Sequence, residues 1–431
     1  MRLLLSLLIL VSAGSAFAKA RTPDGVVYAA HAFHQVLLGC PERVWPALDW
    51  RKTQFVFIQK SKRAAWLIGA EQAAPEELKG TERDSLLAVD YFTVVDFRGR
   101  MTVVTDLAIT GRAKTEAFAF AVHEAFHEFK HQHLERAGAG GRAYPLESRP
   151  REWRKRLEVA LIKGDLDGAA YWFRQWRDGY PAEVSASVDG REGSARYAER
   201  MSVALGELGC QAPGEKLAQF NMKWAKKNPV ALREGLEGEG YWLGAVAGFQ
   251  LDLTDPHWKT EAGDARSPLD ILLGSRETAP NAPSGKPADP RVRAEVARLN
   301  AEIAGWIDPL ERALADREFI RVALPNQAGA TRVFIETFLP SRFQTLSYPV
   351  YAGGQDFGQN ENDRLRLDGD VMTVRGLLSP CGLAQSEFVP VHESSLVAHR
   401  GEYSARTLDF SFTKRGRLEM DAAGFKYLCS N

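Results

Sequence analysis

The pattern of apolar and polar positions predicts a β-rich segment over about residues 19–111. Short runs rich in β-branched and aromatic residues alternate there with polar or glycine-containing turns. These runs span residues 54–58, 65–68, 91–97 and 101–107. The last two flank Arg98-Gly99-Arg100 and are therefore predicted to pair as a β-hairpin.

From residue 112 to about 275 the apolar residues recur at helical spacing instead. One such segment opens at Lys114 or Thr115 and meets no proline or glycine before Gly138. Its apolar stripe consists of Ala117, Phe118, Phe120, Ala121, Phe126 and Phe129. Further helices are predicted over residues 150–163, 165–178, 191–208, 213–227 and 238–251. In the last of these, glycine at positions 240, 244 and 248 favours close backbone packing against a neighbouring element.

Residues 276–290 are rich in proline, alanine and serine, which predicts an exposed connector. A charged amphipathic helix is predicted over residues 291–316. Strands are then expected at residues 319–324, 331–338, 370–375, 408–413, 417–420 and 425–428. The predicted fold class is therefore α+β, with a small β-rich N-terminal lobe (19–111), a mainly helical core (112–275) and a β-rich C-terminal domain with its leading helix (291–431).

The first eighteen residues have the layout of a cleaved secretory signal. Arg2 precedes an apolar run from Leu3 to Val11, and small residues then lead to Ala16-Phe17-Ala18. No later run approaches the roughly 18 apolar residues that a spanning helix requires. We therefore expect a secreted or periplasmic protein with no membrane span.

The composition of the chain indicates which classes of partner and which redox compartment to expect. Lys plus Arg and Asp plus Glu are equal at 55 each among 431 residues, which gives no reason to expect nucleic acid as a partner. The four cysteines favour disulfides in an exported chain, and they allow three pairings. Cys381 with Cys429 would close the C-terminal region, and Cys40 with Cys210 would tie the N-terminal segment to the helical core. No C-x-x-C spacing occurs, so we do not expect zinc ligated by cysteine.

The strongest chemical signal is His123-Glu124-Ala125-Phe126-His127, an H-E-x-x-H pattern on the first predicted helix. Residues four apart lie on one helical face, so both imidazoles can reach one metal ion. Glu124 stands beside that ion, where its carboxylate can take a proton from water as a general base. A tetrahedral site then needs a third protein ligand.

Glu192 supplies that ligand in one interpretation, because residues 192–197 fit the pattern E-G-x-A-x-Y. With the upstream motif, this segment resembles the gluzincin metallopeptidases, and the resemblance covers roughly residues 110–255. It implies a zincin-like domain over residues 19–275, Zn²⁺ held by His123, His127 and Glu192, Glu124 as the base, and a peptide or protein substrate. Gluzincins often carry an aspartate four residues after the ligand glutamate to orient a ligand histidine. Here that position is Arg196.

A second interpretation makes His133 the third ligand, as in the metzincin pattern. That pattern has glycine where this chain has Lys130, and a continuing helix would turn His133 about 280° away from His123. A third makes the chain a metal buffer that uses the histidines at 123, 127, 131 and 133. In a fourth, the chain is an exported binding or assembly protein that has lost catalysis. An intact Glu124 argues against this fourth interpretation, because a structural site gains nothing from a base.

The favoured hypothesis is a zinc metallopeptidase. One of the strands that precede the motif helix is expected to line the cleft and to hold the substrate in an extended form. Tyr197, one turn beyond Glu192, is the favoured residue to stabilise the transition state, with Arg196 and Tyr241 as alternatives.

Overall fold

The computed structural model describes residues 22–46, 48–89, 92–110, 113–130, 142–185, 187–230, 235–255, 257–262, 266–276, 289–324, 334–340, 345–351, 355–360, 363–381 and 387–430. Helices and several sheets both contribute, so the α+β prediction is confirmed. The chain divides into two compact units, Met1–Gln132 with Ala195–Asn221, and His133–Ser194 with Met222–Asn431. The boundaries near Ser194 and Asn221 lie within helices α8 (Arg191–Leu208) and α9 (Gly214–Lys227). The expected division into residues 19–275 and 291–431 stays a prediction.

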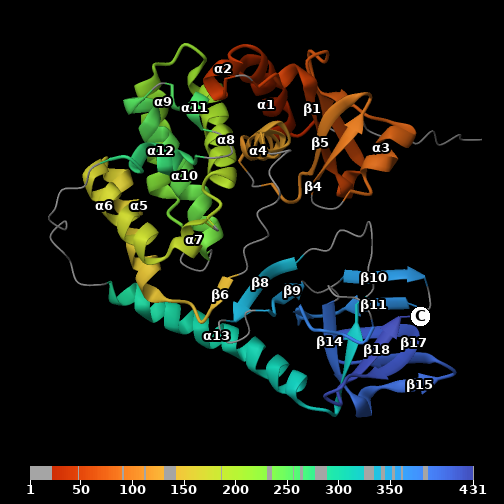
Figure 1. The fold of residues 1–431 in the computed structure, drawn as a ribbon. Helices are drawn as coiled ribbons and strands as arrows, with labels where there is room; N and C mark the ends of the chain where they lie inside the picture. The colour runs from red at the N-terminus through yellow and green to blue at the C-terminus, as the bar shows by residue number, and fades with distance from the viewer. Residues whose placement is uncertain are drawn as a thin grey trace, which may run out of the picture. The chain divides into compact units, whose positions relative to one another are not determined.

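The first unit contains a five-stranded sheet in the order β3-β2-β1-β5-β4 (Figure 1). Its strands are β1 (Thr53–Gln59), β2 (Ala64–Ile68), β3 (Glu76–Glu77), β4 (Phe92–Phe97) and β5 (Arg100–Asp106). Strands β1 and β5 run parallel, and the other neighbours are antiparallel. All four predicted strands are confirmed, and so is the hairpin. Its turn has positive φ at Arg98 (54°) and Gly99 (73°), which matches the twist of the two strands.

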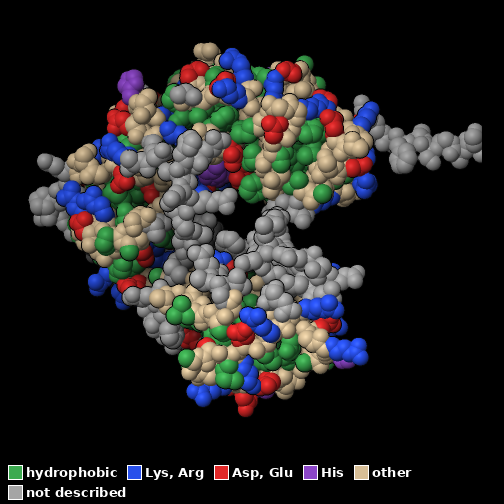
Figure 2. Space-filling model, turned by 45° about the vertical axis from the view of Figure 1, so that its right-hand side comes forward, with side chains coloured by type: hydrophobic (Ala, Val, Ile, Leu, Met, Phe, Trp, Pro, Cys, Tyr) green, Lys and Arg blue, Asp and Glu red, His purple; other side chains and the backbone are tan. Residues whose placement is uncertain are grey.

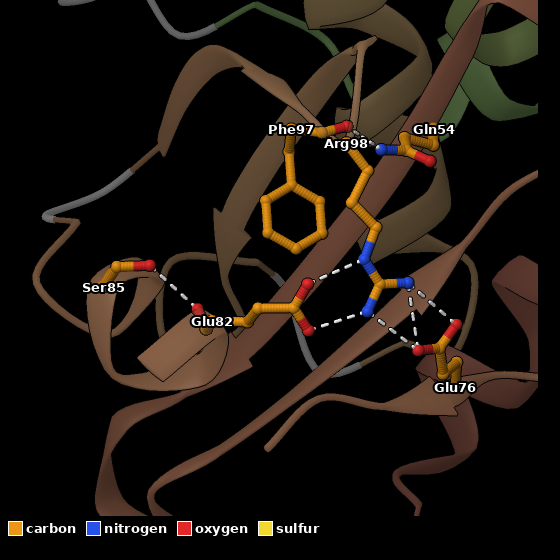
Figure 3. Close-up of polar contacts among 6 residues, drawn as sticks. All are labelled: Gln54, Glu76, Glu82, Ser85, Phe97 and Arg98. Atoms are coloured by element: carbon orange, nitrogen blue, oxygen red, sulfur yellow. Dashed lines mark hydrogen bonds and ion pairs between the residues drawn. The ribbon is translucent and has the colours of Figure 1, made fainter. Parts of the chain in front are cut away.

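A charged network fixes the tip of this hairpin (Figure 3). The Arg98 guanidinium donates to Glu82 at 2.7 and 2.8 Å and to Glu76 at 3.0 Å. Glu76 lies in β3, and Glu82 lies in helix α3 (Gly80–Leu86). From β1, the Gln54 side chain donates to the carbonyl oxygen of Phe97 at 2.6 Å. Strand β4, the first strand of the hairpin, lies at the edge of the sheet. The tip of the hairpin is therefore held by contacts with β1, β3 and α3.

Each face of the sheet is covered by apolar packing. A cluster that includes Val56, Leu67 and Val104 packs with Leu86 of α3. Phe55 points to the other face, with its ring 5.4 Å from Phe33 and 6.4 Å from Phe118. Those two residues belong to π-helix η1 (Phe33–Leu38) and helix α4 (Glu116–Lys130).

The motif segment forms helix α4, as predicted. Its first backbone bonds include Ala119 N–H donating to the Thr115 carbonyl oxygen at 2.9 Å, which places Thr115 at the helix start. Helix α1 (Asp24–Ala32) and η1 were not predicted, because their apolar residues occupy most positions instead of one stripe. Helix α2 (Pro41–Val44) follows directly, and Trp45 beyond it packs on Phe126 of α4 with ring centroids 4.9 Å apart.

The sequence left three pairings open, and the structure contains Cys40–Cys210 and Cys381–Cys429. Cys40–Cys210 lies in the first unit and joins residues 170 positions apart, from the end of η1 to the turn after α8. Cys381–Cys429 lies in the second unit. Each bond therefore joins two cysteines of the same compact unit.

In the second unit, three helices match the predictions to within three residues: α5 (Ser148–Lys163), α6 (Leu166–Gly179) and α10 (Gly235–Thr254). Three short helices were not predicted: α7 (Pro181–Ser185), α11 (Trp258–Glu261) and α12 (Pro268–Leu273). The predicted connector falls largely on residues 277–288, outside the described part of the chain. Helix α13 (Pro290–Ala315) then follows as predicted.

The remaining strands form a nine-stranded and a four-stranded sheet. They are β6 (Arg142–Tyr144), β7 (Phe319–Ala323), β8 (Phe334–Pro340), β9 (Tyr348–Tyr351), β10 (Gln355–Asn360), β11 (Asp363–Leu367), β12 (Val371–Met372), β13 (Val374–Arg375), β14 (Glu387–His392), β15 (Val397–His399), β16 (Glu402–Arg406), β17 (Phe410–Met420) and β18 (Lys426–Ser430). The predicted separation of 408–413 from 417–420 is wrong, because β17 continues through Gly416, which pairs with Ser430. The single strand predicted at 370–375 is also wrong, since β12 and β13 belong to different sheets.

Two surface properties bear on partners. None of the described helices is long and apolar enough to cross a membrane. On the face drawn in Figure 2, basic and acidic side chains are interspersed over the described surface. That mixture agrees with the zero net charge of the sequence.

Replacing Cys40 and Cys210 together by serine should destabilise the first unit. The bond joins residues 170 positions apart and so restricts the unfolded chain. Without it the unfolded chain gains conformational entropy, which lowers the free energy of unfolding by about 3–5 kcal/mol. Equilibrium urea unfolding of the double variant, beside wild type, measures the change. An unchanged unfolding midpoint would contradict this role for the bond.

Candidate metal centre

Helix α4 brings the two motif histidines together. The Nε2 atoms of His123 and His127 are 3.1 Å apart, and the rings meet edge to face with centroids 4.8 Å apart. Burial of Ala119, Val122 and Phe126 holds α4 in place, so the histidine pair lies on a fixed helix. His123 is buried and His127 is half-buried.

Glu192, in the first turn of α8, completes the group. One candidate ligand atom from each of His123, His127 and Glu192 lies within 4.8 Å of the other two. Around a tetrahedral ion with bonds of about 2.1 Å, neighbouring donor atoms lie roughly 3.4 Å apart. The 3.1 Å histidine separation is close to that spacing, and the donors are two imidazoles and a carboxylate. The group could therefore hold a metal ion.

A carboxylate that sequence reasoning missed contacts the first histidine. Oε2 of Glu199 lies 3.2 Å from Nδ1 of His123. Glu199 is on α8, seven residues after Glu192, so helix geometry places both carboxylates on one face, two turns apart. A carboxylate at Nδ1 favours the proton on that nitrogen and leaves Nε2 as the ligand atom. The spacing of seven residues between Glu192 and Glu199 is the feature of the sequence that could have indicated this role. Only the tertiary fold, however, shows that His123 lies opposite Glu199.

The charge on Glu199 is stabilised inside the protein. Burial raises the pKa of Glu199, but Arg196 and His123 more than offset it and bring the pKa to about 2. The Arg196 guanidinium donates to Oε1 of Glu199 at 2.7 Å. Arg196 thus occupies the position where gluzincins often carry an aspartate. The carboxylate that contacts the histidine comes from Glu199, one turn further along α8.

Close packing of glycines fixes the first turn of α8. A Cβ atom added to Gly193 would lie 2.6 Å from Cα of Gly244 and 3.0 Å from the carbonyl oxygen of Gly240. A Cβ on Gly244 would overlap the carbonyl oxygen of Asp189. The predicted close packing of α10 is therefore confirmed at Gly240 and Gly244, and its partner is the segment that carries Glu192.

The other residues predicted for the site differ in how deeply they are buried. Glu124 is half-buried on α4. Tyr197 is fully buried, with its ring 5.9 Å from Trp45, and its catalytic role stays a prediction. Tyr241 lies on α10. His131 and His133 fall outside the described residues.

The chain matches no family model, no curated protein and no solved structure. The resemblance to gluzincins therefore stays a prediction from the sequence motifs.

Gly193→Ala should weaken metal binding. The added methyl group overlaps the α10 backbone, which forces the first turn of α8 and Glu192 to shift at a cost of about 1–3 kcal/mol. Gly305→Ala is the matched control, since that helical glycine has nothing within 4 Å of its added Cβ. Isothermal titration with Zn²⁺ and thermal melting measure both effects. Equal affinities in Gly193→Ala and wild type would contradict the packing argument.

Glu199→Gln should lower metal affinity about 10- to 100-fold, as is typical when a group that orients a ligand histidine is lost. The amide keeps the size of the side chain but removes the charge that favours the Nδ1 proton of His123. Competition with a chromophoric chelator measures the affinity. Glu207→Gln, on the same helix and paired with Lys114 at 3.2 Å, is the control. If both variants bind equally well, Glu199 does not support the site.

Proposed function

We propose that this chain is a zinc-dependent peptidase that hydrolyses peptide bonds. His123, His127 and Glu192 hold the ion, and Glu124 is the general base. The observation that carries the proposal is the convergence of two imidazoles and a carboxylate within 4.8 Å, beside a carboxylate at the position next to the first ligand. Two nitrogen donors and one oxygen donor suit zinc, and three protein ligands leave a fourth position open, as catalytic zinc requires.

When bound, zinc supplies a Lewis acid for the scissile carbonyl group and lowers the pKa of water. The chain's own residues perform the proton transfers. Glu124 takes the proton of the attacking water and then gives it to the leaving amine. The Glu199 carboxylate, 3.2 Å from Nδ1 of His123, keeps the proton on that nitrogen and the imidazole oriented.

Strand β4 is the proposed binding edge for the substrate. It is the last strand of its sheet and pairs only with β5 among the described strands. Phe92, at its start, packs edge to face on Phe120 of α4 with ring centroids 5.3 Å apart. Phe120 lies one turn before Glu124, so an extended peptide added to β4 runs past the helix that carries the base.

The proposed location is secreted or periplasmic. The support is the pair of disulfides, since such bonds persist mainly in oxidising compartments. The expected signal at residues 1–18 agrees with this location, although those residues lie outside the described part of the structure.

Glu124→Gln should abolish hydrolysis of a mixed peptide library while leaving zinc content unchanged. The amide cannot accept the proton of water. Loss of a general base typically lowers the rate about 10²- to 10⁴-fold, so the rate of cleavage should fall by roughly this factor. Glu128→Gln, one turn further along α4, is the matched control and should remain active. Mass spectrometry of the library products reads out cleavage.

Three results separate the alternatives. Full activity in Glu124→Gln would reject the mechanism. Bound zinc with no cleavage by wild type would favour the exported binding or assembly protein. More than one tightly bound metal per chain would favour the metal buffer.

A further inference from the structure

Arg191 holds one oxygen of the third ligand. It is the first residue of α8, directly before Glu192. Its Nε and Nη2 atoms both donate to Oε1 of Glu192, at 2.9 and 2.6 Å. The Glu192 side chain is 5% exposed, whereas that of Arg191 is 36% exposed. A buried carboxylate therefore receives two charge-assisted hydrogen bonds from a partly exposed guanidinium.

Burial of the carboxylate distinguishes this contact from similar ones in the described chain. Arg83 and Asp84, also consecutive in a helix, make the same two-donor contact, with Nε and Nη2 donating to Oδ1 at 3.0 and 2.9 Å. The Asp84 side chain is 48% exposed, however, whereas that of Glu192 is 5% exposed. An exposed ion pair of this kind is weak because water competes for it, and a buried one is stronger.

Two donors on Oε1 occupy both lone pairs of that oxygen. A cation shared with His123 and His127 must then be ligated through Oε2. We propose that Arg191 is a positioning residue that restricts Glu192 to monodentate ligation; this inference rests on the metal site of the proposed function. A carboxylate that binds through both oxygens would add a fourth protein donor atom. Monodentate ligation keeps three, and the fourth tetrahedral position stays open for water.

The test uses the full chain loaded with Co²⁺, whose visible absorption is intense when four-coordinate and weak when five-coordinate. Wild type should give the intense four-coordinate bands. Arg191→Met removes the donors, so Glu192 should become bidentate and the bands should lose intensity. Arg177→Met is the matched control, since it removes a similarly exposed arginine from a consecutive pair.

The outcomes separate this inference from the proposed function. If wild type binds Co²⁺ but Arg191→Met gives the wild-type spectrum, the positioning role is wrong and the metal site stands. The same conclusion follows if Arg177→Met loses intensity equally. If wild type binds no Co²⁺, the metal site itself is wrong and the inference fails with it. Should Arg191→Met fold poorly by circular dichroism, Arg191→Ala serves in its place, and intense wild-type bands in that variant would overturn the inference.

Discussion

The contact between Nδ1 of His123 and Oε2 of Glu199 is the interaction on which the candidate centre depends. At 3.2 Å, it joins α4 to α8 at the point where the histidine pair lies. Because Glu192 lies two turns before Glu199 on the same face of α8, the helix that supports His123 also carries the candidate third ligand. One helix therefore supplies both the carboxylate that contacts His123 and the candidate ligand carboxylate. The glycine contacts with α10 then fix the turn at which that helix begins.

Buried charge at this centre is balanced locally. Glu192 and Glu199 are each almost fully buried, and an isolated carboxylate in such a place is costly. Each is paired with an arginine of the same helix, Arg191 and Arg196. Because these pairs are built into α8, the two carboxylates are stabilised by the chain itself. The chain's own contacts therefore hold the candidate ligand atoms together, which would lower the cost of ordering a metal site.

Features that depend on local sequence were predictable. Helix α4 follows from a continuous apolar stripe, and its i, i+4 spacing is enough to bring His123 and His127 together. The E-G-x-A-x-Y segment indicated Glu192, and glycine spacing indicated the packing of α10. Features that depend on tertiary contacts were not predictable. Glu199 looks like any helical glutamate until α4 lies opposite it, and the strands at 355–360 and 363–367 are polar enough to resemble loops.

Native mass spectrometry of the purified chain tests the central claim most directly. Wild type is compared with Glu192→Ala and His133→Ala after identical treatment with substoichiometric chelator. The account predicts one zinc ion per chain in wild type, its loss in Glu192→Ala and its retention in His133→Ala. Zinc that persists without Glu192, or that leaves with His133, would contradict the assignment of the third ligand. Wild type without stoichiometric zinc would contradict the metal centre itself.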